Sequence, residues 1–269
     1  MGRRLGGVIA ALLLAFGAME SAPTGSAGAE GVAPKPTIVL VHGAWADSAG
    51  WNGVVERLQR AGFPVMAPAN PLRSLAGDAE YLSSVVAGIP GPVILVGHSY
   101  GGAVITNGAG GHPNVQALVF IAAFAPDAGE SIGALAAKYP GSHLPTSLTG
   151  RPYRAGGEPG VDLYIDPAKF SDAFVGDVPA ATAAVMAAEQ RPLTLEASND
   201  KSGPPAWKSL PSWYMVAQSD HAIPPEAERF MAKRAGSQTV EVEGSHAVMV
   251  AHPDEVTELI EAAVAGVAH

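Results

Sequence analysis

The stretch from Pro92 to Gly102, with the sequence PVILVGHSYGG, constrains the fold of this chain more than any other. It begins with β-branched and aliphatic residues, a run typical of a short strand that is buried on both faces. It then passes through Gly97 and Gly101 into the apolar run Ala103 to Thr106, which is typical of the start of a helix. A buried strand that turns directly into a helix predicts a parallel sheet covered by helices.

The turn between this strand and helix has the pattern G-x-S-x-G, with Ser99 at its centre. Between a buried strand and a helix, this pattern is typical of a nucleophile elbow, where a strained serine presents its hydroxyl group at the helix N-terminus. Side chains at Gly97 and Gly101 would collide with the neighbouring strand and helix. The sequence therefore predicts Ser99 as a nucleophile, with the Tyr100 N–H beside it to stabilise negative charge.

A serine nucleophile requires a base, and the base requires a carboxylate that fixes its tautomer. In a chain with this elbow, the acid and then the histidine follow the serine. Among the eight histidines, His246 alone comes directly after the last predicted strand, so we predict it to be the base. The others lie in the elbow, in loops, beside other candidates or at the chain end: His42, His98, His112, His143, His221, His252 and His269.

The predicted acid is Asp220, which comes just after the strand at 212–216. A carboxylate there lies at the carboxyl edge of the sheet, where ligands bind in open α/β folds. Asp127, after the preceding strand, is the alternative acid, whereas Asp200 lies in a polar loop and is expected to be a turn residue.

An oxyanion hole requires two backbone N–H groups that point at the developing negative charge. Tyr100 is predicted to supply one of them. The loop after the first strand, which begins with His42 and Gly43, is predicted to supply the other from Ala44.

Strands and helices alternate along most of the chain, which predicts an α/β-hydrolase fold with a mostly parallel six-stranded sheet and helices on both faces. The predicted strands are 37–41, 63–67, 92–97, 115–124, 212–216 and 239–243, and the main helices are 48–61, 74–88, 102 onward, 224–235 and 253 onward. The alternation stops at 127–207, which is rich in Gly, Pro and Ala and has short helical pieces such as 180–190. We interpret this segment as a helical cap within a single domain, 30–269, whose core is 36–126 and 208–269.

Composition limits the partners of the chain. The formal net charge is −9, which argues against nucleic acid or an anionic membrane surface as the main partner. The absence of cysteine excludes disulfides, thiolate catalysis and cysteine-ligated zinc. Neither a cofactor nor a metal is required by the predicted chemistry.

The first 29 residues are expected to be a signal peptide. Arg3 and Arg4 precede an apolar run from Val8 to Ala18, and Ala27 to Ala29 forms an A-x-A cleavage pattern. A run of about a dozen apolar residues is too short to span a bilayer, so no stable membrane anchor is expected. We therefore expect an exported protein, periplasmic or extracellular, that starts near Glu30.

Three motifs give the chain a resemblance to a known family: His42 to Trp45 followed by Trp51, Gly97 to Gly102, and Ser245 to Met249 followed by Pro253. Together they resemble the small α/β-hydrolases of the plant methylesterase and hydroxynitrile lyase branch, and more closely its exported bacterial relatives. The resemblance covers residues 36–268.

Two departures from the lyases favour ester hydrolysis. In the lyases, a threonine follows the oxyanion-loop histidine and a lysine follows the catalytic histidine, whereas this chain has Gly43 and Ala247. The resemblance thus implies a secreted serine esterase for a small to medium apolar ester, with Trp45, Trp207, Met249 and Phe174 as candidate pocket residues. The alternatives are a hydroxynitrile lyase, a cofactor-free peroxidase-type enzyme, or a ligand-binding protein on a hydrolase scaffold.

Overall fold

A computed structural model describes residues 34–268 of the chain. Six parallel strands form the central sheet in the order β2-β1-β3-β4-β8-β9. Their bounds are β1 Thr37–Val41, β2 Val65–Met66, β3 Val93–Ser99, β4 Val115–Ala123, β8 Ser212–Ala217 and β9 Gln238–Val242. The predicted α/β-hydrolase sheet is therefore confirmed, although the second strand is shorter than expected because only two of its residues pair with β1.

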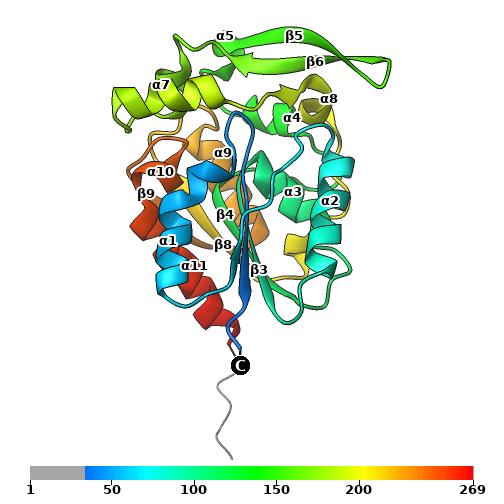
Figure 1. Cartoon of the computed structure of the whole chain (residues 1–269), viewed down its shortest axis with the longest axis vertical. Helices are drawn as coiled ribbons and strands as arrows, with labels where there is room; N and C mark the ends of the chain where they lie inside the picture. The colour runs from blue at the N-terminus through cyan, green and yellow to red at the C-terminus, as the bar shows by residue number, and fades with distance from the viewer. Residues whose placement is uncertain (1–33, 269) are drawn as a thin grey trace, which may run out of the picture. The chain divides into compact units, whose positions relative to one another are not determined.

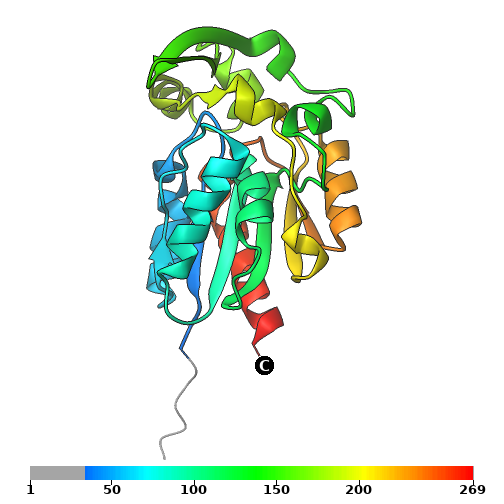
Figure 2. The ribbon, with the colours of Figure 1, turned by 90° about the vertical axis from the view of Figure 1, so that its right-hand side faces the viewer.

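Helices cover both faces of this sheet. The helices α1 (Asn52–Arg60) and α11 (Pro253–Val267) pack together, and α11 lies along β3, β4 and β8. The helices α2 (Leu75–Ala87), α3 (Tyr100–Gly108) and α9 (Pro225–Ala235) pack on the opposite face, as Figure 2 shows. The four middle strands are buried almost throughout, because both of their faces are covered in this way.

Local sequence signals explain where several of these helices begin and end. Ser74 caps α2 by accepting a hydrogen bond from the Gly77 N–H. Pro253 occupies the first position of α11, where a missing N–H costs no hydrogen bond. Gly236 ends α9 with a left-handed backbone, at a φ of 66°.

The segment between β4 and β8 forms a cap over the carboxyl ends of the core strands (Figure 1). It contains the expected short helices, but it also contains an antiparallel sheet of three strands that the sequence did not predict. The expectation of a helical cap was therefore incomplete, because the cap contains strands as well as helices. The strands are β5 Leu148–Ala155, β6 Glu158–Ile165 and β7 Leu193–Thr194, and the helices are α4 Ile132–Ala136, α5 Leu144–Ser147, α6 Phe170–Phe174, α7 Ala180–Glu189 and α8 Leu195–Asn199.

Core and cap belong to one compact unit that begins at Pro34, and their buried apolar side chains form one continuous cluster. The expected signal peptide at 1–29 lies outside the described residues. Within 34–268, no helix combines the length and the apolar character needed to cross a bilayer.

Candidate active site

Ser99, His246 and Asp220 form a continuous hydrogen-bonded chain at the carboxyl edge of the sheet. Nε2 of His246 lies 2.8 Å from the Ser99 Oγ, and Nδ1 of His246 lies 2.5 Å from an Asp220 carboxylate oxygen. All three side chains are buried. Ser99 ends β3, Asp220 follows β8, and His246 follows β9, so three parallel strands carry the three groups to the same edge. This arrangement is that of a Ser-His-Asp triad.

Ser99 has the strained backbone that the elbow pattern predicts, with φ 53° and ψ −122°. The two neighbouring glycines are required by close backbone approaches. A Cβ atom on Gly97 would lie 2.6 Å from the Gly101 carbonyl oxygen, and one on Gly101 would collide with the carbonyl oxygen of Val41. The turn therefore tolerates no side chain at either position.

The carboxylate of Asp220 is fixed from two sides. One oxygen accepts hydrogen bonds from the N–H groups of Ala222 (2.6 Å) and Ile223 (2.8 Å), and the other faces His246. The alternative acid, Asp127, is placed elsewhere, because its carboxylate pairs with Lys208 at 2.5 Å. Lys208 is the main cause of the lowered pKa of Asp127. Asp200 accepts a hydrogen bond from the Leu75 N–H at 2.8 Å and so anchors the start of α2.

The loop after β1 lies directly against the elbow. A Cβ atom on Gly43 would lie 2.5 Å from the Ser99 Cβ, so only glycine allows this approach. Ala44 and Tyr100, the two expected oxyanion donors, line the same pocket as Ser99. His42 holds the loop in place, since its Nε2 accepts from the Asn70 N–H at 2.9 Å and its Nδ1 bonds the Gly43 carbonyl at 2.8 Å.

Burial governs the protonation of three further groups near the site, and sequence reasoning missed all three. Burial lowers the pKa of His98, whose ring bonds the His246 carbonyl. Burial also raises the pKa of Asp78, which accepts a hydrogen bond from the Tyr100 hydroxyl at 2.8 Å. Burial, followed by the charge of Asp220, raises the pKa of Glu228. His98 could have been found from its place inside the elbow motif, but no local pattern marks Asp78 or Glu228.

An apolar pocket of about 160 Å³ opens on the Ser99 hydroxyl between core and cap. Among residues 34–268, no charged side chain lines it. Of the expected pocket residues, Trp45 lines it, whereas Phe174 packs against the His246 ring at a centroid distance of 4.9 Å. Trp207 instead donates a hydrogen bond to the Pro126 carbonyl, and neither it nor Met249 reaches the pocket. The other lining residues are Ala44, Tyr100, Phe124, Ile132, Gly133, Ala136, Ala137, Ser142, Leu144, Pro145, Leu148, Leu163, Leu193, Ser198, Ala222 and Ile223.

Fold and site together define a serine hydrolase. Residues 38–259 match the alpha/beta hydrolase family, and the chain belongs to that family. A carbendazim hydrolyzing esterase from Nocardioides sp. (strain SG-4G) is 36% identical over 113 residues, which make up 37% of this chain. The matched segment spans about half of that relative, 47% of its length.

Many solved structures share the fold, and two of them illustrate the likeness. Polyneuridine aldehyde esterase has a TM-score of 0.73 at 23% identity, over 85% of this chain and 99% of that one. An extracellular alpha/beta-hydrolase from a Paenibacillus species has a TM-score of 0.69 at 22% identity, over 85% and 98%. These neighbours confirm the resemblance in fold to the small methylesterase-like hydrolases and their bacterial relatives.

Proposed function

We propose that the protein is a carboxylic-ester hydrolase that works through an acyl-enzyme on a small, apolar ester. One observation carries this proposal: the hydrogen-bonded chain of Ser99, His246 and Asp220 ends at a hydroxyl group that faces an uncharged pocket. A neutral acyl or alcohol group fits such a pocket, whereas a charged group would lose its hydration there without gaining a partner.

Ser99 attacks the ester carbonyl carbon while His246 Nε2 accepts the hydroxyl proton. The carboxylate of Asp220 accepts a hydrogen bond from His246 Nδ1 and stabilises the imidazolium that forms. The N–H groups of Ala44 and Tyr100 stabilise the oxyanion. The protonated His246 then donates its proton to the departing alcohol. In the second half, water loses a proton to His246 and attacks the acyl-enzyme carbonyl carbon. The protonated His246 then returns this proton to the departing Ser99 oxygen, which releases the acid and restores the hydroxyl group.

The size of the pocket supports a short acyl chain or a single ring. A dry cavity of roughly 150 Å³ holds a benzene molecule in another protein, and the pocket here has about 160 Å³. The name of the carbendazim hydrolyzing esterase, a relative of this chain, also supports ester hydrolysis.

The environment of Gly43 weighs against the lyase alternative. A Cβ atom at this position would lie 2.5 Å from the Ser99 Cβ and 2.9 Å from the His98 carbonyl oxygen. The threonine of the lyases therefore has no room in this loop. Ala247, in place of the lyase lysine, is completely buried and brings no charge to the site.

A series of p-nitrophenyl esters of increasing acyl length tests the proposal. We expect turnover of the acetate and butyrate esters, a decline with longer chains, and a loss of at least about 10³-fold in kcat in a Ser99→Ala variant. An organophosphate should label wild-type Ser99 and leave the variant unlabelled. A folded protein that hydrolyses no ester and resists the organophosphate would exclude the esterase proposal and favour a lyase or a binding protein.

We further propose that residues 1–29 direct export and are removed. The basic pair Arg3 and Arg4, the apolar run that follows and the A-x-A pattern before Glu30 support this proposal. N-terminal sequencing of the protein from the culture medium or periplasm tests it. A first residue near Glu30 is expected, and Met1 on the exported protein would contradict it.

A further inference from the structure

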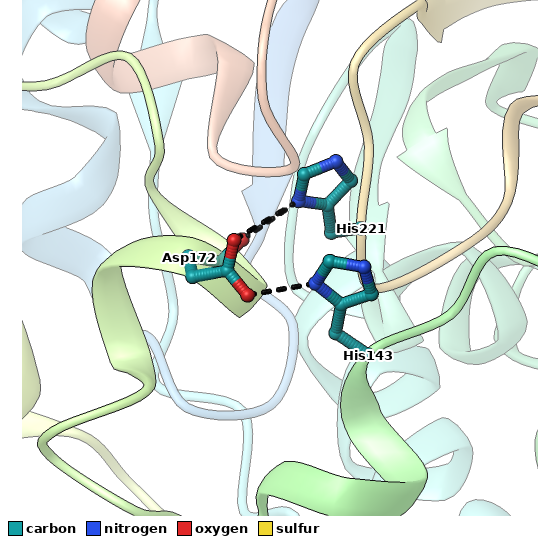
Figure 3. A group of neighbouring side chains, drawn as sticks. All are labelled: His143, Asp172 and His221. Atoms are coloured by element: carbon teal, nitrogen blue, oxygen red, sulfur yellow. Dashed lines mark hydrogen bonds and ion pairs between the residues drawn. The ribbon is translucent and has the colours of Figure 1, made fainter.

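His143, Asp172 and His221 meet on the surface between the cap and the core (Figure 3). His143 precedes α5 and Asp172 lies in α6, both in the cap, whereas His221 directly follows Asp220 in the core. Nδ1 of His143 lies 2.7 Å from one Asp172 carboxylate oxygen, and Nδ1 of His221 lies 3.6 Å from the other. Three residues that are distant in the sequence thus direct their ligand-type atoms at one point.

The backbone fixes this convergence. The His143 N–H donates a hydrogen bond to the His221 carbonyl at 2.7 Å, and the two imidazole rings lie 4.2 Å apart between centroids. Nδ1 of His221 also donates a hydrogen bond to the Asp172 carbonyl oxygen at 3.0 Å, so this nitrogen carries a proton that a bound metal ion would displace. Since both histidines are anchored by main-chain contacts, only small rotations of the three side chains are needed to change their mutual distances.

The three residues have the chemistry of a metal site. Within the described residues, the only basic groups that pair with the Asp172 carboxylate are these two histidines, so no permanent positive charge neutralises it. One ligand atom from each residue lies within 4.8 Å of the others. Zinc bonds of about 2.0–2.2 Å to nitrogen and oxygen hold the ligand atoms of a tetrahedral site at mutual distances below this 4.8 Å limit.

We propose that His143, Asp172 and His221 bind one divalent transition-metal ion of the zinc class, with water as the remaining ligand. The site is open to solvent, because the side chains of His143, Asp172 and His221 are 40%, 65% and 44% exposed. Two imidazoles and one carboxylate favour Zn²⁺, Co²⁺, Ni²⁺ or Cu²⁺ over Mg²⁺ and Ca²⁺, which prefer oxygen ligands.

The position of the site gives the ion a role as a clamp between cap and core. Asp172 lies in the same short helix as Phe174, whose ring packs on His246 and whose carbonyl accepts a hydrogen bond from the Ala247 N–H. His221 adjoins the triad acid Asp220. A bound ion therefore links the cap segment that covers the triad histidine to the loop that holds the triad acid.

Metal binding is measured on untagged protein that has been treated with EDTA and freed of the chelator. We expect saturable binding of one Zn²⁺ per chain in calorimetry and visible absorption bands with Co²⁺. We also expect an increase in Tm of about 5 °C or more at a Zn²⁺ concentration roughly 100 times the Kd. Mg²⁺ at the same concentration should leave Tm unchanged.

Single variants assign the ion to these residues. His143→Ala, His221→Ala and Asp172→Asn should each weaken Zn²⁺ binding by at least about tenfold and remove the Co²⁺ bands. Asp172→Asn keeps an oxygen that His143 can bond, so its fold should be preserved. His112→Ala is the matched control, because His112 bonds Ser83 away from this cluster. Wild-type protein that binds no Zn²⁺, or variants that bind it with wild-type affinity, would overturn the proposal.

Discussion

The imidazole of His98 bonds the main chain of His246, with its Nε2 atom 3.0 Å from the His246 carbonyl oxygen. A carbonyl oxygen only accepts hydrogen bonds, so Nε2 of His98 carries the proton and donates it. The other ring nitrogen, Nδ1, is buried with no hydrogen-bond partner among the described residues. Burial lowers the pKa of His98, so the ring stays neutral beside the triad. His98 therefore acts as a positioning residue for His246.

Replacement of His98 should reveal this positioning role. His98→Leu leaves the buried His246 carbonyl without its donor, at a cost of about 1–3 kcal/mol in the free energy of unfolding. We expect kcat to fall about tenfold or more, because His246 loses part of its orientation. His98→Gln is the matched control, since its amide N–H can reach the same carbonyl and should restore most of kcat. Equal losses in both variants, measured by urea unfolding and ester hydrolysis, would contradict this role.

Replacement of each candidate acid by asparagine should affect kcat differently. Asp220→Asn removes the charge that stabilises the His246 imidazolium, and we expect kcat to fall by about 10³- to 10⁴-fold. Asp127→Asn removes an exposed pair with Lys208, and kcat should stay close to that of the wild type. Initial rates on p-nitrophenyl butyrate measure both. A large loss in the Asp127 variant alone would show that the triad is assigned wrongly.

Glu228 should make the stability of the protein depend on pH. Its side chain is completely buried, one oxygen accepts from the Ala217 N–H at 3.0 Å, and burial raises its pKa well above 4.5. The pKa of such a carboxyl group is higher in the folded state than in the unfolded state. The group therefore stabilises the folded state at pH values below its unfolded-state pKa, and this stabilisation is lost as the pH rises toward its folded-state pKa. The free energy of unfolding should thus decrease by up to about 1.4 kcal/mol per pH unit above pH 4.5 because of this group.

Glu228→Gln isolates this effect, because glutamine keeps the shape and does not titrate. As the pH rises from 5 to 8, the free energy of unfolding of the variant should increase relative to that of the wild type. Glu226→Gln on the same helix is the control, since Glu226 forms an exposed pair with Arg229. Urea unfolding at several pH values measures both variants, and a pH-independent difference for Glu228→Gln would refute the prediction.

The core of this fold could be predicted from the sequence because each of its signals is local. The elbow needs Gly97 and Gly101 for close approach, and the strand before it has an uninterrupted apolar run. The order of Ser99, Asp220 and His246 then follows from the positions of three strand ends. The structure brings these three together as the sequence predicted.

The cap strands and the supporting groups could not be predicted in the same way. Strand β5 is largely exposed, so it lacks the alternating apolar pattern of a half-buried strand, whereas β6 has that pattern only over the short stretch from Val161 to Ile165. A second signal was the pair Gly156 and Gly157, both with positive φ, which connects these strands in a hairpin. Glu228 lies beside Asp220 only because α9 packs on β8, and no local pattern encodes that contact.

The wall of the apolar pocket should set the preferred acyl length. Ile132, the first residue of α4, is buried and lines the pocket, so Ile132→Ala should enlarge it. Each additional buried methylene group contributes about 0.8 kcal/mol. An ester whose acyl chain is two carbons longer than butyrate should therefore gain about tenfold in kcat/KM, relative to the butyrate ester, when both are hydrolysed by the variant. The same truncation costs about 2–5 kcal/mol in stability, so assays belong well below the Tm.

A matched control separates pocket size from loss of stability. Leu82→Ala truncates a buried side chain of α2 that does not line the pocket. It should lower the Tm by a similar amount and leave the ratio of kcat/KM values for p-nitrophenyl hexanoate and butyrate unchanged. If both variants shift this ratio equally, or if Ile132→Ala leaves it unchanged, the acyl group does not occupy this pocket. The ester would then have to reach Ser99 with its acyl chain directed elsewhere.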